Sequence, residues 1–337
     1  MSKRAQTAKI VHMRFDIVTI FPGFFAGFFE HGIVRRAIRE GLVTIETHDL
    51  RNFTHDKHRT VDDRPFGGGE GMVLKPEPLA EALEALGIGS KGTREQGSKG
   101  ASHPSEQKPL DGDPGREQGN KGTREQGSKG ASHPSEQKPL DGDPGREQGS
   151  EGATKRTKVI LLSAQGRLFN QPVARELAAL DRVVLISGRY EGVDERINEL
   201  YCDMELSIGD YVLSGGELAA AVVVDATMRL IPGVLGNEAS GEFESFGATD
   251  AEITADIDGV PRSQHGSGGL LDYPQYTRPA EFAGLRAPEV LMNGDHLEIR
   301  RWRREQQLRK TLRNRPELLE KAALSDDDRR ILKSLER

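Results

Sequence analysis

Short apolar runs that alternate with helical patterns are the feature of this 337-residue sequence that most constrains its fold. The runs have the length of β-strands and lie at residues 14–21, 42–50, 158–163 and 182–187. The stretches with helical spacing lie at residues 22–41, 79–87, 174–180 and 219–231. Strands that are apolar almost throughout are typical of a parallel sheet with helices on both faces. The sequence therefore predicts an α/β fold, and a charged helical pattern over residues 278–337 predicts a separate small all-α domain.

A duplicated segment interrupts this alternation. Residues 91–119 recur as residues 121–149, and each copy has a single large aliphatic residue and no aromatic one. Such a segment cannot bury enough apolar surface to offset the entropy of ordering it, and it has no apolar face on which repeats could stack. We therefore predict a long disordered insertion over residues 89–156. The other predicted parts are a flexible N-terminus (1–12), the two parts of the α/β domain (13–88 and 157–235) and an interdomain linker (236–277).

Composition and charge exclude several classes of protein. The single cysteine, Cys202, permits no internal disulfide, which favours a reduced, cytoplasmic protein. No apolar run approaches the roughly 20 residues that span a bilayer, so we expect no membrane partner. The net charge is −6, so any surface that binds nucleic acid must be local.

Three glycine-containing loops follow expected strands in the second half of the chain. They read SAQGR (163–167), SGRYEG (187–192) and SGGE (214–217), the last after a strand expected to end at Leu213. The carboxyl ends of parallel strands meet at one edge of a sheet, so the loops predict a shared ligand pocket there. A helix that begins near Gly216 would aim backbone N–H groups into it. The alternative is three ordinary turns. The sequence has neither a Walker A motif nor a G-x-G-x-x-G after a strand, which disfavours ATPases and nicotinamide enzymes.

A polar segment at residues 52–72 has three interpretations. Its cations suit phosphates, its carboxylates can accept from a guanine edge, and its glycines let a base approach the backbone, which favours an RNA-facing loop. A metal site would use His55, Asp56, His58 and Asp62, but interleaved cations oppose it. The third interpretation is a solvated loop held by internal ion pairs.

A second basic region lies at residues 296–319 and contains the only tryptophan, Trp302. Clustered cations with an embedded aromatic residue suit contact with a phosphate backbone, although an ordinary solvated helix face is the alternative. The cations of this region are Arg300, Arg301, Arg303, Arg304, Arg309, Lys310, Arg313 and Arg315.

Several long segments in a fixed order resemble the bacterial tRNA (guanine-N1)-methyltransferases, over residues 13–88 and 157–335. The segments are FPGFF (21–25), the loop at 52–72, GRYEGVDER (188–196), SIGDYVLSGGE (207–217), RLIPGVLGNEAS (229–240), LLDYPQYTRP (270–279) and EIRRWR (298–303). The resemblance implies a parallel sheet with a deep C-terminal trefoil knot of the SPOUT type, a helical tRNA-binding domain, and a homodimer whose active sites combine both subunits. It also implies methylation of N1 of guanosine 37, immediately 3′ of the anticodon in tRNA, with S-adenosylmethionine as cofactor.

The resemblance assigns roles residue by residue. The residues expected to contact the cofactor are Leu162, Ser163, Ala164, Gly188, Tyr190, Glu191, Gly192, Ile208, Gly209, Asp210, Tyr211, Val212, Leu213, Gly215 and Gly216. Those expected to contact tRNA are His58, Arg59, Asp62, Arg64, Gly67, Gly69, Gly71, Arg278, Arg300, Arg301 and Arg303. Glu244 and Arg229 are the expected catalytic residues. No tightly bound metal is expected, and Gly215 and Gly216 are expected to be bare because the cofactor and the chain crossing leave no room.

The chemistry explains why these two residues are needed. Guanine N1 carries a proton and needs a general base, for which a carboxylate is suited. Negative charge then develops toward O6, where a guanidinium or a magnesium ion can stabilise it. The family pattern has aspartate at the position of Glu244, proline is common at Ala164, and asparagine is usual at Asp295. The open alternatives are an RNA-binding protein without activity, a methyltransferase for another RNA and, more remotely, a metal-dependent hydrolase.

Overall fold

A computed structural model of the chain describes residues 12–94, 156–236, 244–247 and 267–336. The predicted flexible N-terminus, up to residue 11, and the predicted insertion from residue 95 to residue 155 lie outside the described residues, so their predicted disorder stays a prediction. Residues 91–94, which we assigned to the insertion, are helical, and Lys91 Nζ donates to the backbone oxygen of Asn198 at 3.3 Å.

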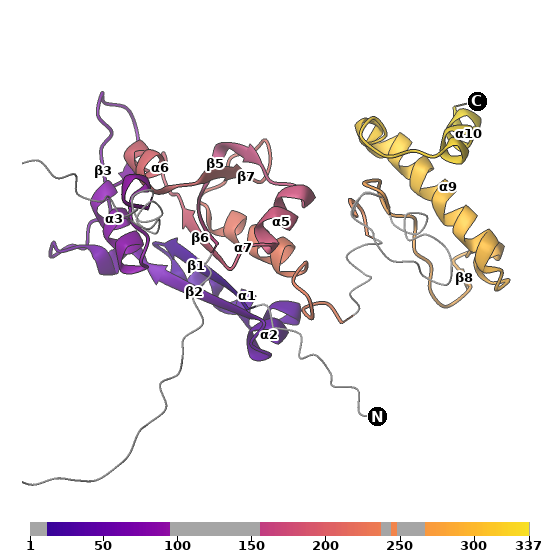
Figure 1. The fold of residues 1–337 in the computed structure, drawn as a ribbon, viewed down its shortest axis with the longest axis horizontal. Helices are drawn as coiled ribbons and strands as arrows, with labels where there is room; N and C mark the ends of the chain where they lie inside the picture. Colours follow the sequence, from indigo (N-terminus) through magenta and orange to yellow (C-terminus); the bar gives the residue numbers. More distant parts are fainter. Residues whose placement is uncertain (1–11, 95–155, 237–243, 248–266, 337) are drawn as a thin grey trace, which may run out of the picture. The chain divides into compact units, whose positions relative to one another are not determined.

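Five parallel strands form the predicted sheet, which confirms the α/β fold (Figure 1). Their order is β2-β1-β6-β5-β7. The strands are β1 (Met13–Thr19), β2 (Val43–Asp49), β5 (Thr157–Leu168), β6 (Arg182–Ser187) and β7 (Met204–Ser207). Because every pair is parallel, all five carboxyl ends lie at the same edge of the sheet.

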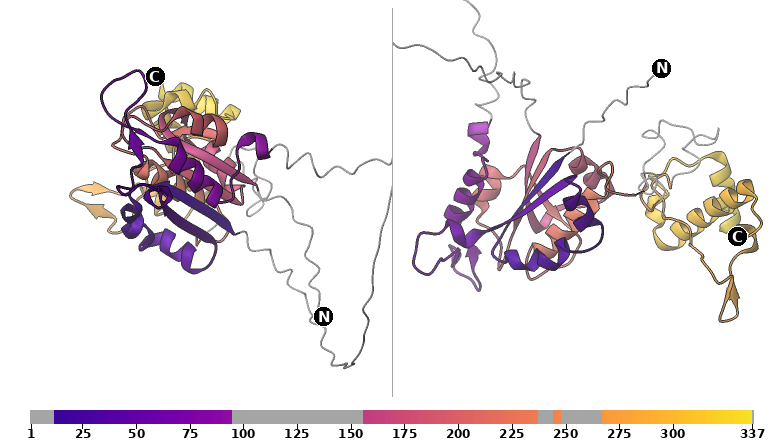
Figure 2. Two further views of the ribbon diagram at one scale, coloured as in Figure 1. Left: turned by 90° about the vertical axis from the view of Figure 1, so that its left-hand side faces the viewer. Right: turned by 90° about the horizontal axis from the view of Figure 1, so that it is seen from below.

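Helices cover both faces of this sheet, as Figure 2 shows. One face is covered by η1 (Pro22–Phe25), α1 (Ala26–Phe29), α2 (Gly32–Arg39), α5 (Gln171–Ala178) and α7 (Glu217–Met228). The other face is covered by η2 (Leu50–Phe53), α3 (Pro76–Ala85) and α6 (Glu195–Tyr201).

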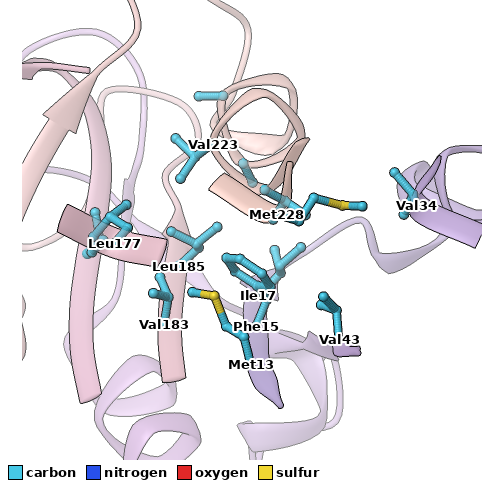
Figure 3. Close-up of a cluster of buried hydrophobic side chains, with 14 of the residues drawn as sticks. Met13, Phe15, Ile17, Val34, Val43, Leu177, Val183, Leu185, Val223 and Met228 are labelled. Carbon is cyan, nitrogen blue, oxygen red and sulfur yellow. The ribbon is translucent and has the colours of Figure 1, made fainter. Parts of the chain in front are cut away.

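The alternation of side chains along the strands produces two hydrophobic cores. Phe15 and Leu185 point into the core beneath α7, where Val223 and Met228 meet them (Figure 3). Val184, next to Leu185 along β6, points into the opposite core. A strand that is buried on both faces needs apolar residues at odd and even positions alike, which is the pattern that predicted this sheet.

Three predicted boundaries were wrong. The stretch at 22–41 is not one helix, because His31 is extended and Gly32, the first residue of α2, has a φ of +59°. The strand before SGGE ends at Ser207 rather than Leu213, so residues 208–216 form a loop. The strand β5 continues to Leu168 and contains the SAQGR segment as a register shift instead of ending before it. The short helix α6 was not predicted.

The C-terminal part is mainly helical. Its helices are η5 (Glu289–Leu291), α9 (His296–Asn314), η6 (Pro316–Leu318) and α10 (Asp326–Leu335). It is not all-α as predicted, because β8 (Glu281–Phe282) and β9 (Leu285–Arg286) form a hairpin. The turn between them places Ala283 and Gly284 at positive φ, as two-residue hairpin turns require. Among the described residues, no helix combines the length and apolar composition needed to cross a membrane.

Candidate functional site

A cavity of about 210 Å³ lies at the carboxyl ends of β5, β6 and β7, where the sequence predicts a pocket. The three predicted loops line it together. All the residues expected to contact the cofactor are among its lining residues except Asp210, which is an exposed member of the same loop. The lining residues that sequence reasoning missed include Arg189, Val193, Glu195, Glu205, Ser207 and Ala219.

Close backbone approach explains the two glycines that precede α7. The Gly216 N–H donates to the backbone oxygen of Gly188 at 2.9 Å, so the second and third loops are joined directly. A Cβ on Gly216 would lie 2.8 Å from Ser187 Cα, and one on Gly215 would overlap the side chain of Arg189. The expected crowding is therefore present, and the chain's own backbone and the side chains of Arg189 and Glu217 cause it.

The first loop is held in the same manner. Pairing of β5 with β7 shifts register between Leu162 and Arg167, so residues 163–166 bulge toward the pocket. A Cβ on Gly166 would lie 2.5 Å from the backbone carbon of Glu205. A glycine inside a strand often marks this kind of close approach, and here it lets β7 pass the bulge.

The predicted RNA-facing loop is connected to the pocket. The strands β3 (Asp62–Asp63) and β4 (Val73–Leu74) form a short hairpin, and Gly67, Gly69 and Gly71 all have positive φ in its turn. The Leu74 N–H donates to the Gly192 oxygen at 3.0 Å, and the Glu191 N–H donates to the Met72 oxygen at 3.0 Å. A Cβ on Gly71 would overlap the Glu191 side chain. The end of this loop therefore packs directly against a wall of the pocket.

Much of the same loop is bound internally, as the solvated-loop interpretation expects. Asp56 accepts from the backbone N–H and the hydroxyl of Thr60 and from the backbone N–H of His58, and these hydrogen bonds lower its pKa. Arg59 donates to Asn52 Oδ1 at 2.5 Å and to the backbone oxygen of Arg51. In contrast, no hydrogen bond or ion pair of the Arg64 guanidinium is found within the described part of the chain.

The four residues that we considered as metal ligands in this loop do not come together. Within the described ranges, the side chains with ligand geometry are Asp16, Glu46 and His48 on β1 and β2. Burial would raise the pKa of Asp16, but hydrogen bonds from His48, Arg14 and Arg182 outweigh it and lower that pKa. The two guanidinium groups identify this cluster as a charge network of the sheet.

Arg229 and Glu244, the expected catalytic residues, form an ion pair. Arg229, which ends α7, donates from Nη2 to the Glu244 carboxylate at 2.5 and 2.6 Å. Both side chains are partly exposed, at 36% and 42%. Neither is among the described residues that line the pocket of their own chain.

The cations of α9 fall into two groups. Arg304 donates two hydrogen bonds to the buried carboxylate of Asp328 at 2.8 and 2.9 Å and is therefore structural. Burial would raise the pKa of Asp328, but the hydrogen bonds and charge of Arg304 lower it. The guanidinium carbon of Arg303 lies 4.8 Å from the centroid of the Tyr273 ring. The ring centroids of Trp302 and Tyr276 are 6.2 Å apart. Arg309 pairs with Glu305, and Arg315, just after the helix, pairs with Glu317. The α9 cations without an ion pair among the described residues are Arg300, Arg301, Arg303, Lys310 and Arg313, and outside the helix the same holds for Arg278.

Comparison with known proteins agrees with this geometry. The profile of the family described as tRNA (guanine-1)-methyltransferase TrmD matches residues 13–99 and 143–321. The chain belongs to this family. The unmatched residues 100–142 lie inside the duplicated segment.

The relatives of this TrmD-family chain match it over nearly its full length. A tRNA (guanine-N(1)-)-methyltransferase of Koribacter versatilis is 49% identical, with 96% of this chain and 98% of that protein covered. Proteins with the same description from Dehalococcoides mccartyi and Geobacter metallireducens are 41% and 40% identical, with 95% and 96% of this chain covered. The coverage of the two proteins themselves is 96% and 98%.

The lining residues of this pocket could hold a cationic ligand with an attached nucleoside. Leu162, Ile208 and Leu213 supply apolar lining for a base, and the carboxylates of Glu191 and Glu205 supply negative charge. Gly192 lines the pocket with no atom within 4 Å of where its Cβ would stand, so its bare backbone faces open space. The guanidinium of Arg189, the lining cation, is engaged by Glu217 and Ser214 and thus does not offer a free positive charge to a cationic ligand.

Proposed function

We propose that the protein methylates N1 of guanosine 37, immediately 3′ of the anticodon in tRNA, with S-adenosylmethionine as the methyl donor. The observation that carries this proposal is the pocket built from three glycine-containing loops at the sheet edge, in a chain of the TrmD family. A cytoplasmic location is proposed with it, because that is where a bacterial tRNA is available for modification.

The pocket residues would hold the donor by shape and charge. The backbone of residues 208–216 and the bulge at 163–166 form two walls, and residues 188–192 form the third. Glu191 lies at the junction of this third wall with the RNA-facing loop, where it can favour a positive charge. When bound, the cofactor supplies a methyl group on a sulfonium, which is the electrophile.

Glu244 and Arg229 would carry out the proton transfer. Glu244 accepts the proton of guanine N1, which makes that nitrogen nucleophilic. Arg229 already donates a hydrogen bond to the Glu244 carboxylate. Its guanidinium can therefore move from that carboxylate to the negative charge that develops on guanine O6. The alternative source of positive charge at O6 is a magnesium ion, and activity after removal of divalent ions by a chelator distinguishes the two.

A homodimer with shared active sites is part of the proposal. Arg229 and Glu244 are outside the described lining of their own pocket, which supports their delivery to the pocket of a second copy. An exposed apolar patch supports the same conclusion. It comprises Phe21 just before η1, Phe24 within η1, and Leu218 and Val222 one turn apart on α7. All four are 44–51% exposed, and the two elements are in contact. An apolar patch of this kind is typical of an interface.

The trefoil knot remains a proposal as well. It is supported by the crossing at Gly216, where the chain that enters α7 passes within hydrogen-bonding distance of the loop after β6. The backbone bridge between Arg189 and Gly215 lies at the same point. Residues that allow this close approach are those that the family resemblance assigns to the knot.

Two surfaces would hold the tRNA. The loop at 52–72 offers Arg64 and the bare backbone of Gly67 and Gly69, and its end at Gly71 and Met72 packs against a wall of the pocket. The helix α9 offers exposed Arg301 and the Arg303–Tyr273 stack, which suit phosphates and bases respectively.

A methyl-transfer assay tests the proposal. The protein is incubated with labelled S-adenosylmethionine and unmodified tRNA, and the label should appear in tRNA with guanosine 37 but not in tRNA with adenosine there. Incorporation into both would indicate a methyltransferase for another RNA position. Cofactor binding without any incorporation would indicate an RNA-binding protein that lost activity.

A further inference from the structure

Two of the three pocket loops are joined by a buried ion pair that the sequence did not reveal. Arg189 Nε donates to Glu217 Oε2 at 3.1 Å, and Arg189 Nη1 donates to the backbone oxygen of Ser214 at 2.9 Å. The Glu217 side chain is 2% exposed and that of Arg189 is 21% exposed. Arg189 belongs to the loop after β6. Ser214 belongs to the loop before α7, and Glu217 is the first residue of that helix.

The other carboxylate oxygen of Glu217 extends the network to the sheet. Thr19 Oγ1, at the end of β1, donates to Glu217 Oε1 at 2.8 Å and accepts from the Phe21 N–H at 3.0 Å. The Arg189 guanidinium lies 4.6 Å above the Phe21 ring. Both carboxylate oxygens therefore have partners, which a buried charge requires.

The bare backbone of Gly215 belongs to the same arrangement. A side chain there would overlap Arg189 Nε, so the glycine leaves the space that the guanidinium needs to reach Glu217. The residues next to this network are those that face the pocket: Tyr190 and Glu191 follow Arg189, and Leu213 precedes Ser214. A change in the ion pair would therefore move the pocket walls directly.

We propose that Arg189 and Glu217 are positioning residues that set the distance between the second and third loops for the methyl donor. A buried ion pair is seldom more stable than well-packed apolar residues of the same volume, so stability alone gives little reason for one at this point. The pair gives a defined geometry instead, because a guanidinium fork and a carboxylate meet in few orientations. This inference rests on the proposed function, because it concerns the pocket for that donor.

The test compares Glu217→Gln with a matched change in another buried pair. The glutamine keeps the oxygen that accepts from Thr19 but removes the charge that holds Arg189. Asp328→Asn makes the same chemical change in the Arg304–Asp328 pair of the C-terminal part, where the carboxylate side chain is 5% exposed. The dissociation constants of S-adenosylmethionine and of tRNA are measured by calorimetry and filter binding, well below the melting temperature of each variant.

We expect Glu217→Gln to weaken cofactor binding by about 10- to 100-fold, since small misplacements of a site have effects of that order. Its tRNA affinity should stay unchanged. Asp328→Asn should lower the melting temperature and leave cofactor affinity as in wild type. The inference is overturned if wild type binds the cofactor and Glu217→Gln binds it equally well, or if both variants lose cofactor affinity to the same extent.

A second variant keeps the inference testable if Glu217→Gln folds poorly. Arg189→Lys retains the charge but replaces the planar fork that fixes Glu217 and Ser214 with a single ammonium group, so it should fold and still weaken cofactor binding. An unchanged affinity in this variant would overturn the inference. If wild type itself binds no S-adenosylmethionine, the proposed function is refuted and the inference with it. If wild type binds it and the variants bind it equally well, only the inference fails.

Discussion

Arginine side chains have different roles in the pocket at the sheet edge and on the surface of α9. In the pocket, Arg189 is turned inward to a buried carboxylate, while glycine backbone faces the ligand space. On α9, Arg304 is turned inward to Asp328, but Arg301 and Arg303 remain exposed. The number of arginines in the sequence does not predict which of them form ion pairs with buried carboxylates and which are exposed.

The two regions differ in what defines a site. Backbone conformation defines the pocket, because close approaches at Gly166 and Gly216 determine where its walls lie. Side-chain exposure defines the α9 surface, because the helix itself would form with many other sequences. Substitutions at the close approaches should therefore displace whole walls of the pocket. Each substitution on the α9 surface should change only the contacts of the side chain that is replaced.

The largest expected effect is on turnover. Glu244→Gln removes the proposed base and should reduce methyl transfer by about 10²- to 10⁴-fold, the usual contribution of general-base catalysis. Glu244→Asp restores the carboxylate of the family pattern and should be clearly more active than the glutamine variant. Single-turnover rates with labelled cofactor measure both.

The matched readout for these variants is cofactor affinity, which both should leave as in wild type because Glu244 is outside the described lining of its own pocket. Equal activity of wild type and Glu244→Gln would show that another group removes the proton.

The second prediction concerns folding stability. Gly216→Ala places a Cβ 2.8 Å from the Ser187 backbone and should lower the free energy of unfolding by about 1–3 kcal/mol. Gly27→Ala is the control, because nothing lies within 4 Å of its Cβ and it is helical, so it should be neutral or slightly stabilising. Urea unfolding of both variants measures the difference. Similar stability of the two would contradict the close packing at the crossing.

The third prediction separates the two groups of arginines on α9. Arg304→Ala leaves the buried Asp328 without its partner and should lower the free energy of unfolding by about 1–3 kcal/mol. Arg301→Ala should leave stability unchanged but weaken tRNA binding and reduce its salt dependence by about one counterion. Thermal melts and tRNA binding at several salt concentrations give both values. The same loss of stability in both variants would refute the division.

The smallest expected effect is a pH dependence. The pKa of Asp328 is lowered in the folded protein, so its stabilising contribution is present above its ordinary value of 3.8 and is lost as pH falls below that value. The stability difference between wild type and Asp328→Asn should therefore be constant near neutral pH and shrink in acid. Urea unfolding of both proteins at several acidic pH values tests this. A stability difference that grows as pH falls would contradict the prediction.

The parts of the structure that the sequence predicts are those set by local pattern. The runs at β1, β5 and β6 predict a parallel sheet because they are apolar at odd and even positions. The glycine-containing segments within β5, after β6 and after β7 mark the pocket. The end of β7 was mispredicted because Tyr211 and Val212 have strand propensity but serve in a loop, where they are 54% and 87% exposed. The hairpin at Ala283–Gly284 lacked a strong turn signal.

The parts that the sequence could not predict depend on residues far apart in the chain. Thr19 and Glu217 meet across 198 positions, and Gly71 meets Glu191 across a stretch that contains the whole duplicated segment. One signal was available for Glu217: a carboxylate at the start of an apolar helix needs a partner if that end is buried. Its partner could not be named from the sequence.

The direction of β5 has a consequence for the duplicated segment. That segment joins the domain just before Thr157, at the amino end of the strand, whereas the pocket lies at the carboxyl ends. We therefore expect a change in the number of copies of the unit to leave the rim that carries the pocket unchanged. Tandem copying of the gene at this point would lengthen the chain ahead of β5 and would leave the loops that line the pocket at their present length.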